Sequence, residues 1–71
     1  MSRTLTIRLN GIEQPTCAAT LGQLLAGMGI NADARGVAVA RNDEVVTKAL
    51  WDATPINEHD CIEIVRPVPG G

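Results

Sequence analysis

The hydrophobic pattern of the chain begins with a hairpin. Residues 4–9 alternate strictly between polar and apolar side chains, a period of two that is typical of a half-buried strand. Asn10-Gly11 follows and favours a type I′ turn, because both central positions of that turn need a positive φ. A return strand is therefore expected over residues 12–17. Pro15 has no backbone N–H, so it places this strand at a sheet edge or ends its pairing there.

One helix is predicted after the hairpin. Thr20 and Gln23 have the spacing of a capping box, and Gly29 stands where a left-handed C-terminal cap belongs. Gly22 and Gly27 each weaken such a helix by about 1 kcal/mol relative to alanine, so packing must hold it. The apolar residues recur at helical spacing and form one stripe that faces a core: Leu21, Leu24, Leu25 and Met28.

The second half predicts three more strands. Residues 37–41 alternate, Asn42-Asp43 makes a turn, and residues 44–46 form a short return strand. A single helical turn is expected over residues 47–51, and its tryptophan is expected to fill a gap in the core. The last strand is expected over residues 61–66, with its two isoleucines on the inner face.

This order of elements predicts an α+β, two-layer fold, because a helix can bury an apolar stripe only by covering one face of a sheet. The most economical topology is a mixed four- to five-stranded sheet with one helix packed across it. The first and last strands would lie side by side at its centre, which is the β-grasp or ubiquitin-like arrangement. Residues 1–67 are expected to form this domain, and residues 68–71 a flexible, extended C-terminal Gly-Gly tail.

Composition narrows the classes of function. A chain of 71 residues is one small domain or a fragment, and it buries only about 60% of its unfolded surface, which leaves little core for a substrate cleft. That argues against a free-standing enzyme. A net charge of −2 does not indicate a nucleic-acid-binding surface. Neither a signal peptide nor a membrane span is predicted, so a cytoplasmic protein is expected.

The residues inside the domain predict no active site and no metal site. Cys17 and Cys61 could form at most one disulfide and lack C-x-x-C spacing, so reduced thiols are expected. Cys17 is interpreted as a small apolar filler. A thiol at Cys61 could in principle use His59 as its base, but the histidine lies in a predicted turn between two acidic residues, which favours a solvated side chain.

The last residues are the unusual part of the sequence. Pro67-Val68-Pro69 fixes two φ angles and keeps the backbone extended, and Gly70-Gly71 follows. A stiff segment that ends in residues without side chains is suited to a narrow channel, where its carboxylate could approach another enzyme's nucleotide. The alternative is a disordered terminus that happens to contain glycines.

The strand order, the helix and this tail together resemble the ubiquitin-like sulfur carriers of the ThiS type. The sequence departs from the usual family pattern at Thr47, at Lys48 and at His59, which replaces a turn glycine and would be strained at a positive φ. The residues that carry the resemblance are 36–42, 44–46, Trp51, 60–65, Val68 and Gly70-Gly71.

The resemblance implies a carrier protein rather than an enzyme, with no bound cofactor. An E1-like adenylating enzyme (ThiF type) would use ATP to convert the Gly71 carboxylate to an acyl-adenylate. A persulfide donor would then leave a thiocarboxylate, which would pass its sulfur to a thiazole synthase (ThiG type) in thiamine biosynthesis. The residues that would enter the enzyme's channel are Val68, Pro69, Gly70 and Gly71.

Alternate residues of a strand point to opposite faces of the sheet, and this alternation predicts a small, mildly apolar surface on the outer face that could dock a partner. An ordinary sheet face with no partner explains the same alternation equally well. Three alternative functions remain open. They are the small subunit of molybdopterin synthase, with the same tail chemistry, a protein-conjugating relative of ubiquitin, and a β-grasp interaction domain whose tail is never activated. The predicted docking residues are Val65, Glu63, Ala38, Ala40 and Thr6.

Overall fold

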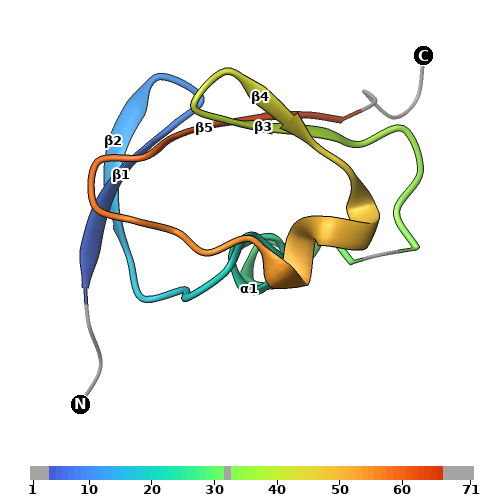
Figure 1. Ribbon diagram of the computed structural model, residues 1–71, viewed down its shortest axis with the longest axis horizontal. Helices are drawn as coiled ribbons and strands as arrows, with labels where there is room; N and C mark the ends of the chain where they lie inside the picture. Colours follow the sequence, from blue (N-terminus) through green and yellow to red (C-terminus); the bar gives the residue numbers. More distant parts are fainter. Residues whose placement is uncertain (1–3, 32, 67–71) are drawn as a thin grey trace.

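The computed structural model describes residues 4–31 and 33–66, which form one mixed sheet with both helices on the same side (Figure 1). The strands are β1 (Leu5–Leu9), β2 (Ile12–Thr16), β3 (Ala38–Arg41), β4 (Glu44–Val46) and β5 (Cys61–Val65). The helices are α1 (Leu21–Gly27) and a 3₁₀ helix, η1 (Lys48–Ala53). Every predicted element is present, with its ends within two residues of the expected positions.

The sheet has the order β2-β1-β5-β3-β4. Strands β1 and β5 run parallel at its centre, while β1–β2, β3–β5 and β3–β4 are antiparallel pairs. The prediction that the first and last strands lie side by side at the centre of the sheet is therefore confirmed. Pro15 lies in β2, at one edge of the sheet, where a missing N–H costs least.

Both hairpin turns have two consecutive residues at positive φ, as a type I′ turn requires. The values are 50° and 82° at Asn10 and Gly11, and 52° and 71° at Asn42 and Asp43. The two asparagine side chains also bind β5: Asn10 Oδ1 accepts from the backbone N–H of Ile64 at 2.8 Å, and Asn42 Oδ1 accepts from that of Cys61 at 2.9 Å. Each turn thus fixes the central strand as well as its own hairpin.

Helix α1 begins with the predicted cap in a slightly shifted form. Thr20 Oγ1 accepts from the Gln23 N–H at 3.2 Å, while Gln23 Oε1 accepts from the Ala19 N–H at 2.8 Å, one residue before the position that a regular capping box uses. Gly29 has a φ of 82°, so the left-handed C-terminal cap is confirmed. The apolar stripe faces the sheet as predicted, with Leu21 and Leu25 fully buried.

The core lies between the sheet and α1 and is aliphatic except for Trp51. This side chain is buried, and its Nε1 donates to the Val46 carbonyl at 3.0 Å, so the ring fills the core and keeps its polar atom paired. The other buried hydrophobic residues are Leu5, Ile7, Leu9, Leu21, Leu25, Ile30, Val39, Ile56, Ile62 and Ile64. No helix of the described residues is long and apolar enough to cross a membrane.

Candidate functional site

The candidate site lies on the outer face of the sheet, the face turned away from α1. Cross-strand pairing joins Ala38 to Val65, and Ala40 to both Glu63 and Val45. Val65 is 66% exposed and Val45 78% exposed, although both are large hydrophobic residues. We call Val65, Ala38, Ala40 and Val45 the outer patch.

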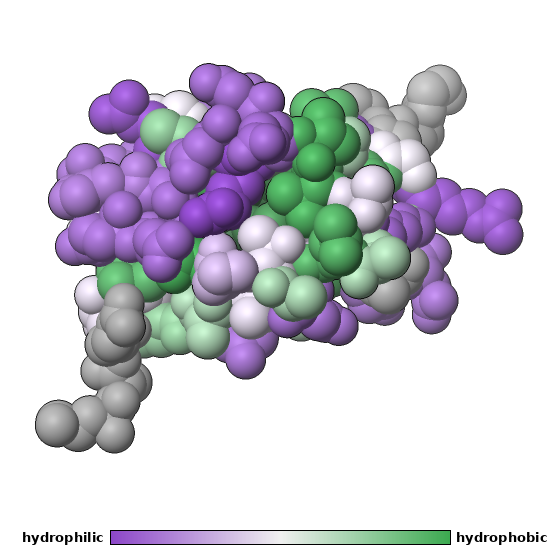
Figure 2. All heavy atoms as spheres, in the orientation of Figure 1, coloured by the Kyte–Doolittle hydropathy of each residue, from purple (hydrophilic) through white to green (hydrophobic). Residues whose placement is uncertain are grey.

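The outer patch has small side chains at its centre and larger ones on both sides. Ala38 and Ala40 lie on β3, while Val65 lies on β5 and Val45 on β4. Figure 2 shows hydrophobic side chains gathered over the part of the molecule where β4 runs, with hydrophilic side chains over the region of β1 and β2. An exposed apolar area of this kind, next to a polar one, is typical of a surface that contacts another protein.

Four of the five predicted docking residues come together, and Thr6 does not. Val65, Glu63, Ala38 and Ala40 are direct cross-strand neighbours. The Thr6 carbonyl instead accepts from the His59 N–H at 2.6 Å, before β5 begins, so Thr6 lies at the opposite end of that strand from Val65. The prediction that Thr6 adjoins the other four residues was wrong, because the register of the parallel pair β1–β5 puts the start of β1 beside residue 59.

Val45 belongs to the same surface but was not predicted as part of it. The sequence could have predicted the position of Val45, because the turn at Asn42-Asp43 fixes the register of β4 on β3. That register pairs Val45 with Ala40 and turns both side chains to the same face. An exposed valine one residue from the half-buried Val46 therefore marks the outer side of the edge strand.

The chain leaves the sheet beside the outer patch. Strand β5 ends at Val65, and Arg66 is the last residue described. The predicted tail (Val68, Pro69, Gly70 and Gly71) lies outside the described residues, and so does the domain boundary expected at residues 67–68. The position of the outer patch at the end of β5 means that any partner which takes up the following residues must pass close to it.

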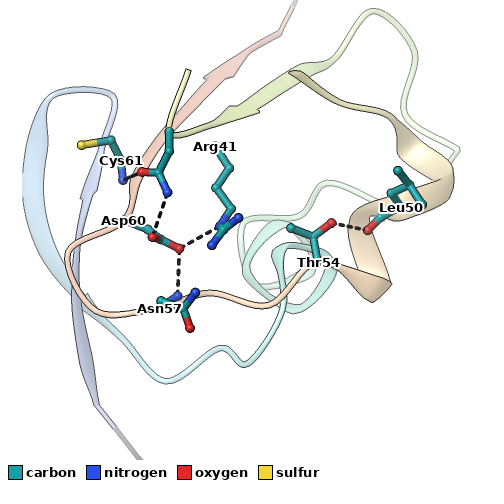
Figure 3. Close-up of polar contacts among 7 residues, drawn as sticks. Arg41, Leu50, Thr54, Asn57, Asp60 and Cys61 are labelled. Carbon is teal, nitrogen blue, oxygen red and sulfur yellow. Dashed lines mark hydrogen bonds and ion pairs between the residues drawn. The ribbon is translucent and has the colours of Figure 1, made fainter. Parts of the chain in front are cut away.

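A closed polar cluster holds the start of β5. Asp60 is buried, and its carboxylate accepts from Arg41 Nε at 2.9 Å, from Asn42 Nδ2 at 3.0 Å and from the Asn57 N–H at 2.8 Å (Figure 3). Burial alone would raise the pKa of Asp60. The hydrogen bonds and the positive charge of Arg41 outweigh it and hold the pKa below its ordinary value of 3.8. With both oxygens occupied, this carboxylate is structural.

The two cysteines are free and exposed. The interpretation of Cys17 as an apolar filler is therefore wrong: it follows the end of an edge strand, and its Sγ lies 3.6 Å from Thr4 Oγ1 at the surface. His59 is exposed and has a φ of 67°. This is the positive φ at which a histidine in place of a turn glycine was expected to be strained. No hydrogen bond of the described residues joins its side chain to Cys61.

The clusters of His, Cys, Asp and Glu in residues 4–31 and 33–66 include none that could hold a metal ion. The outer patch is the candidate functional site in the described part of the chain.

The ThiS family model matches residues 3–71 of this chain. A ThiS protein from Geobacter metallireducens is similar in both its crystal and its solution structure, each at 26% identity over 94% of this chain. The crystal structure is covered completely with a TM-score of 0.69, and the solution structure to 88% with a TM-score of 0.75. The fold is accordingly the predicted β-grasp fold.

A thiazole synthase from Paramagnetospirillum magneticum is also similar. It is 39% identical over 64 residues, which make up 89% of this chain and 19% of that protein. The present chain thus spans about a fifth of the length of this relative.

Proposed function

Because this chain belongs to the ThiS family, we propose that it carries sulfur for thiamine biosynthesis as a thiocarboxylate on Gly71. The observation that carries the proposal is the extent of the family match, which runs to residue 71 and so includes Gly70-Gly71. The proposal takes Gly71 as the last residue of the working protein. It also takes residues 1–67 as the folded carrier domain and residues 68–71 as the arm.

The chemistry follows from the weakness of a carboxylate as an electrophile. An E1-like adenylating enzyme would join the Gly71 carboxylate to AMP from ATP, with release of pyrophosphate, so that AMP becomes the leaving group. A persulfide sulfur would attack the acyl carbon and displace AMP. A second thiol of the donor would then attack the S–S bond, form a disulfide with the donor's own sulfur and release the thiocarboxylate on Gly71. ATP is a substrate of the partner, and the carrier itself binds no cofactor.

In this mechanism the carrier contributes an accessible C-terminal carbonyl and a surface for docking. Glycine has no Cβ, so the acyl carbon of Gly71 stays open to attack inside a narrow channel. The docking surface in this proposal consists of the outer patch, at the end of β5, and the neighbouring Glu63. It therefore keeps four of the predicted residues (Val65, Glu63, Ala38 and Ala40) and adds Val45. In this proposal the partner enzymes supply every catalytic acid, base and nucleophile.

The proposed acceptor is a thiazole synthase of the ThiG type. The similarity of this chain to part of a protein named thiazole synthase supports it, because it links the two within the same pathway. The activating enzyme (ThiF type) and the persulfide donor complete the set of partners. The proposed setting is the cytoplasm, where the exposed thiols of Cys17 and Cys61 would stay reduced.

Intact mass spectrometry tests the proposal. After incubation with the adenylating enzyme, ATP and a sulfur donor, the mass of the carrier should increase by the replacement of one oxygen by one sulfur. A variant with one alanine added after Gly71 should show no increase, because its carboxylate is displaced and carries a side chain. An unchanged mass of the wild-type chain would contradict the proposal.

The cysteines provide the matched control. Both are exposed, so Cys17→Ser combined with Cys61→Ser should fold normally and should still gain the sulfur. Loss of the mass increase in this double variant would place the sulfur on a thiol instead of on Gly71.

A further inference from the structure

Three basic residues lie at the end of the molecule where β5 ends. Arg66 directly follows Val65, whose partner Ala38 opens β3. The chain reaches β3 through Arg35, next to Ala34, and the Ala34 carbonyl accepts a hydrogen bond from Lys48 Nζ. Figure 1 shows the segment before β3, the end of β5 and the start of η1 at the same end of the molecule. We call Arg35, Lys48 and Arg66 the basic border.

The basic border is exposed, and no described carboxylate pairs with it. The ion pair found among residues 4–31 and 33–66 is the one between Arg41 and Asp60, at the other end of β3. The whole chain has six basic and eight acidic residues, so half of its basic residues collect at one end of a protein with a net negative charge.

The opposite side of the outer patch is predominantly acidic, with three carboxylates and one arginine, Arg8, which lines the same hollow as Asp43 and Glu63. Glu63 pairs with Ala40, and Glu44 pairs with Arg41 next to the β3–β4 turn, which also contains Asp43. The apolar patch thus lies between a basic side, where the chain leaves the sheet, and an acidic side at the turn. A charge arrangement with two unlike sides favours one orientation of a docked partner over the reverse.

We propose that the basic border binds an acidic rim around the channel of the activating enzyme and orients the carrier as its C-terminal residues enter. This inference rests on the proposed function. Gly71 is the fifth residue after Arg66, and five residues span at most about 17 Å. The border therefore stays at the mouth of a channel when Gly71 reaches the nucleotide. The attraction would speed encounter and fix orientation.

Arg66→Glu is the test variant, and Arg8→Glu is its matched control. Both arginines are exposed, and each reversal changes the net charge by the same amount. Arg8 lies opposite Cys61, at the other end of β5 from Arg66. In ATP–pyrophosphate exchange by the activating enzyme at low salt, Arg66→Glu should raise the KM for the carrier about tenfold, whereas Arg8→Glu should change it by less than about twofold. Arg66→Lys should keep the wild-type value.

Salt separates a charge effect from a change of shape. The Debye length falls from about 10 Å at 0.1 M salt to about 3 Å at 1 M, so the difference between the two reversals should largely disappear at high salt. A difference that persists there, or equal KM values for the two reversals at low salt, would overturn the basic border alone. A wild-type chain that supports no exchange would overturn the proposed function, and the basic border with it.

Discussion

Asp60 connects parts of the chain that are far apart in sequence. Its carboxylate binds Arg41 and Asn42, nineteen and eighteen residues away, and its carbonyl accepts from the Arg8 N–H at 2.9 Å. These contacts join the β3–β4 hairpin, the loop before β5 and the central strand β1. A single buried carboxylate therefore fixes where the last strand begins, and the position of that strand decides where the chain leaves the sheet.

We predict that Asp60→Asn lowers the free energy of unfolding by about 1–3 kcal/mol at pH 7, because an amide leaves a buried donor facing the donors of Asn42 and Asn57. The lowered pKa of Asp60 also predicts a pH dependence. Its stabilising contribution is full above the ordinary value of 3.8 and is lost as the pH falls through the folded-state pKa. Urea denaturation at pH 7 and pH 3 measures both effects.

The comparison between the two proteins is the control. Wild type should lose more stability than Asp60→Asn between pH 7 and pH 3, since only wild type has this carboxylate to protonate. Equal losses would show that Asp60 does not contribute to the pH dependence.

Among the elements, the contact between α1 and η1 depends on Gly22. A methyl group at this position would overlap Asp52 Oδ1 and would come within 3.2 Å of the Asp52 Cα, so the two helices approach too closely for a side chain. Gly27, in the same helix, has open space around its Cα. The sequence pattern does not distinguish the two glycines, but only Gly22 is required by a close contact between the helices.

We predict opposite effects of alanine at these two positions. Gly27→Ala should stabilise the protein by about 0.5–1 kcal/mol through its higher helix propensity. Gly22→Ala should destabilise it by about 1–2 kcal/mol, because the overlap with Asp52 outweighs the same gain. Thermal unfolding of the two variants checks this, and Gly22→Ala combined with Asp52→Ala should recover part of the loss. A stabilising Gly22→Ala would show that η1 moves away at little cost.

The elements also show which parts of the structure local sequence signals can predict. The turn at Asn10-Gly11, the Thr20 cap and the alternation around Ile62 and Ile64 each depend on a few adjacent residues, and all were predicted correctly. The position of Thr6 relative to Val65 depends on a parallel pairing between segments more than fifty residues apart, which no local pattern encodes. The clustering of the basic border has the same non-local origin.

At the scale of the whole molecule, the two faces of the sheet differ in burial. The inner face packs on α1 and forms the core, while the outer face leaves Val65 and Val45 exposed beside the point where the chain exits. A domain this small has little interior to shape into a binding pocket. In the proposed function, its recognition by partners depends on this outer surface and on the residues that follow β5.

Two equally exposed residues test whether the outer patch is the docking surface. Val65 is 66% exposed on the outer face, and Ile12 is 67% exposed on β2, where pairing with the buried Leu9 turns it to the other face. Val65→Asp should raise the KM for activation at least tenfold, because docking would bury an unpaired charge, whereas Ile12→Asp should leave it unchanged. Far-UV circular dichroism and thermal unfolding should show both variants folded. If Val65→Asp is activated as well as Ile12→Asp, the activating enzyme binds elsewhere, and the exposure of the outer patch needs another partner to explain it.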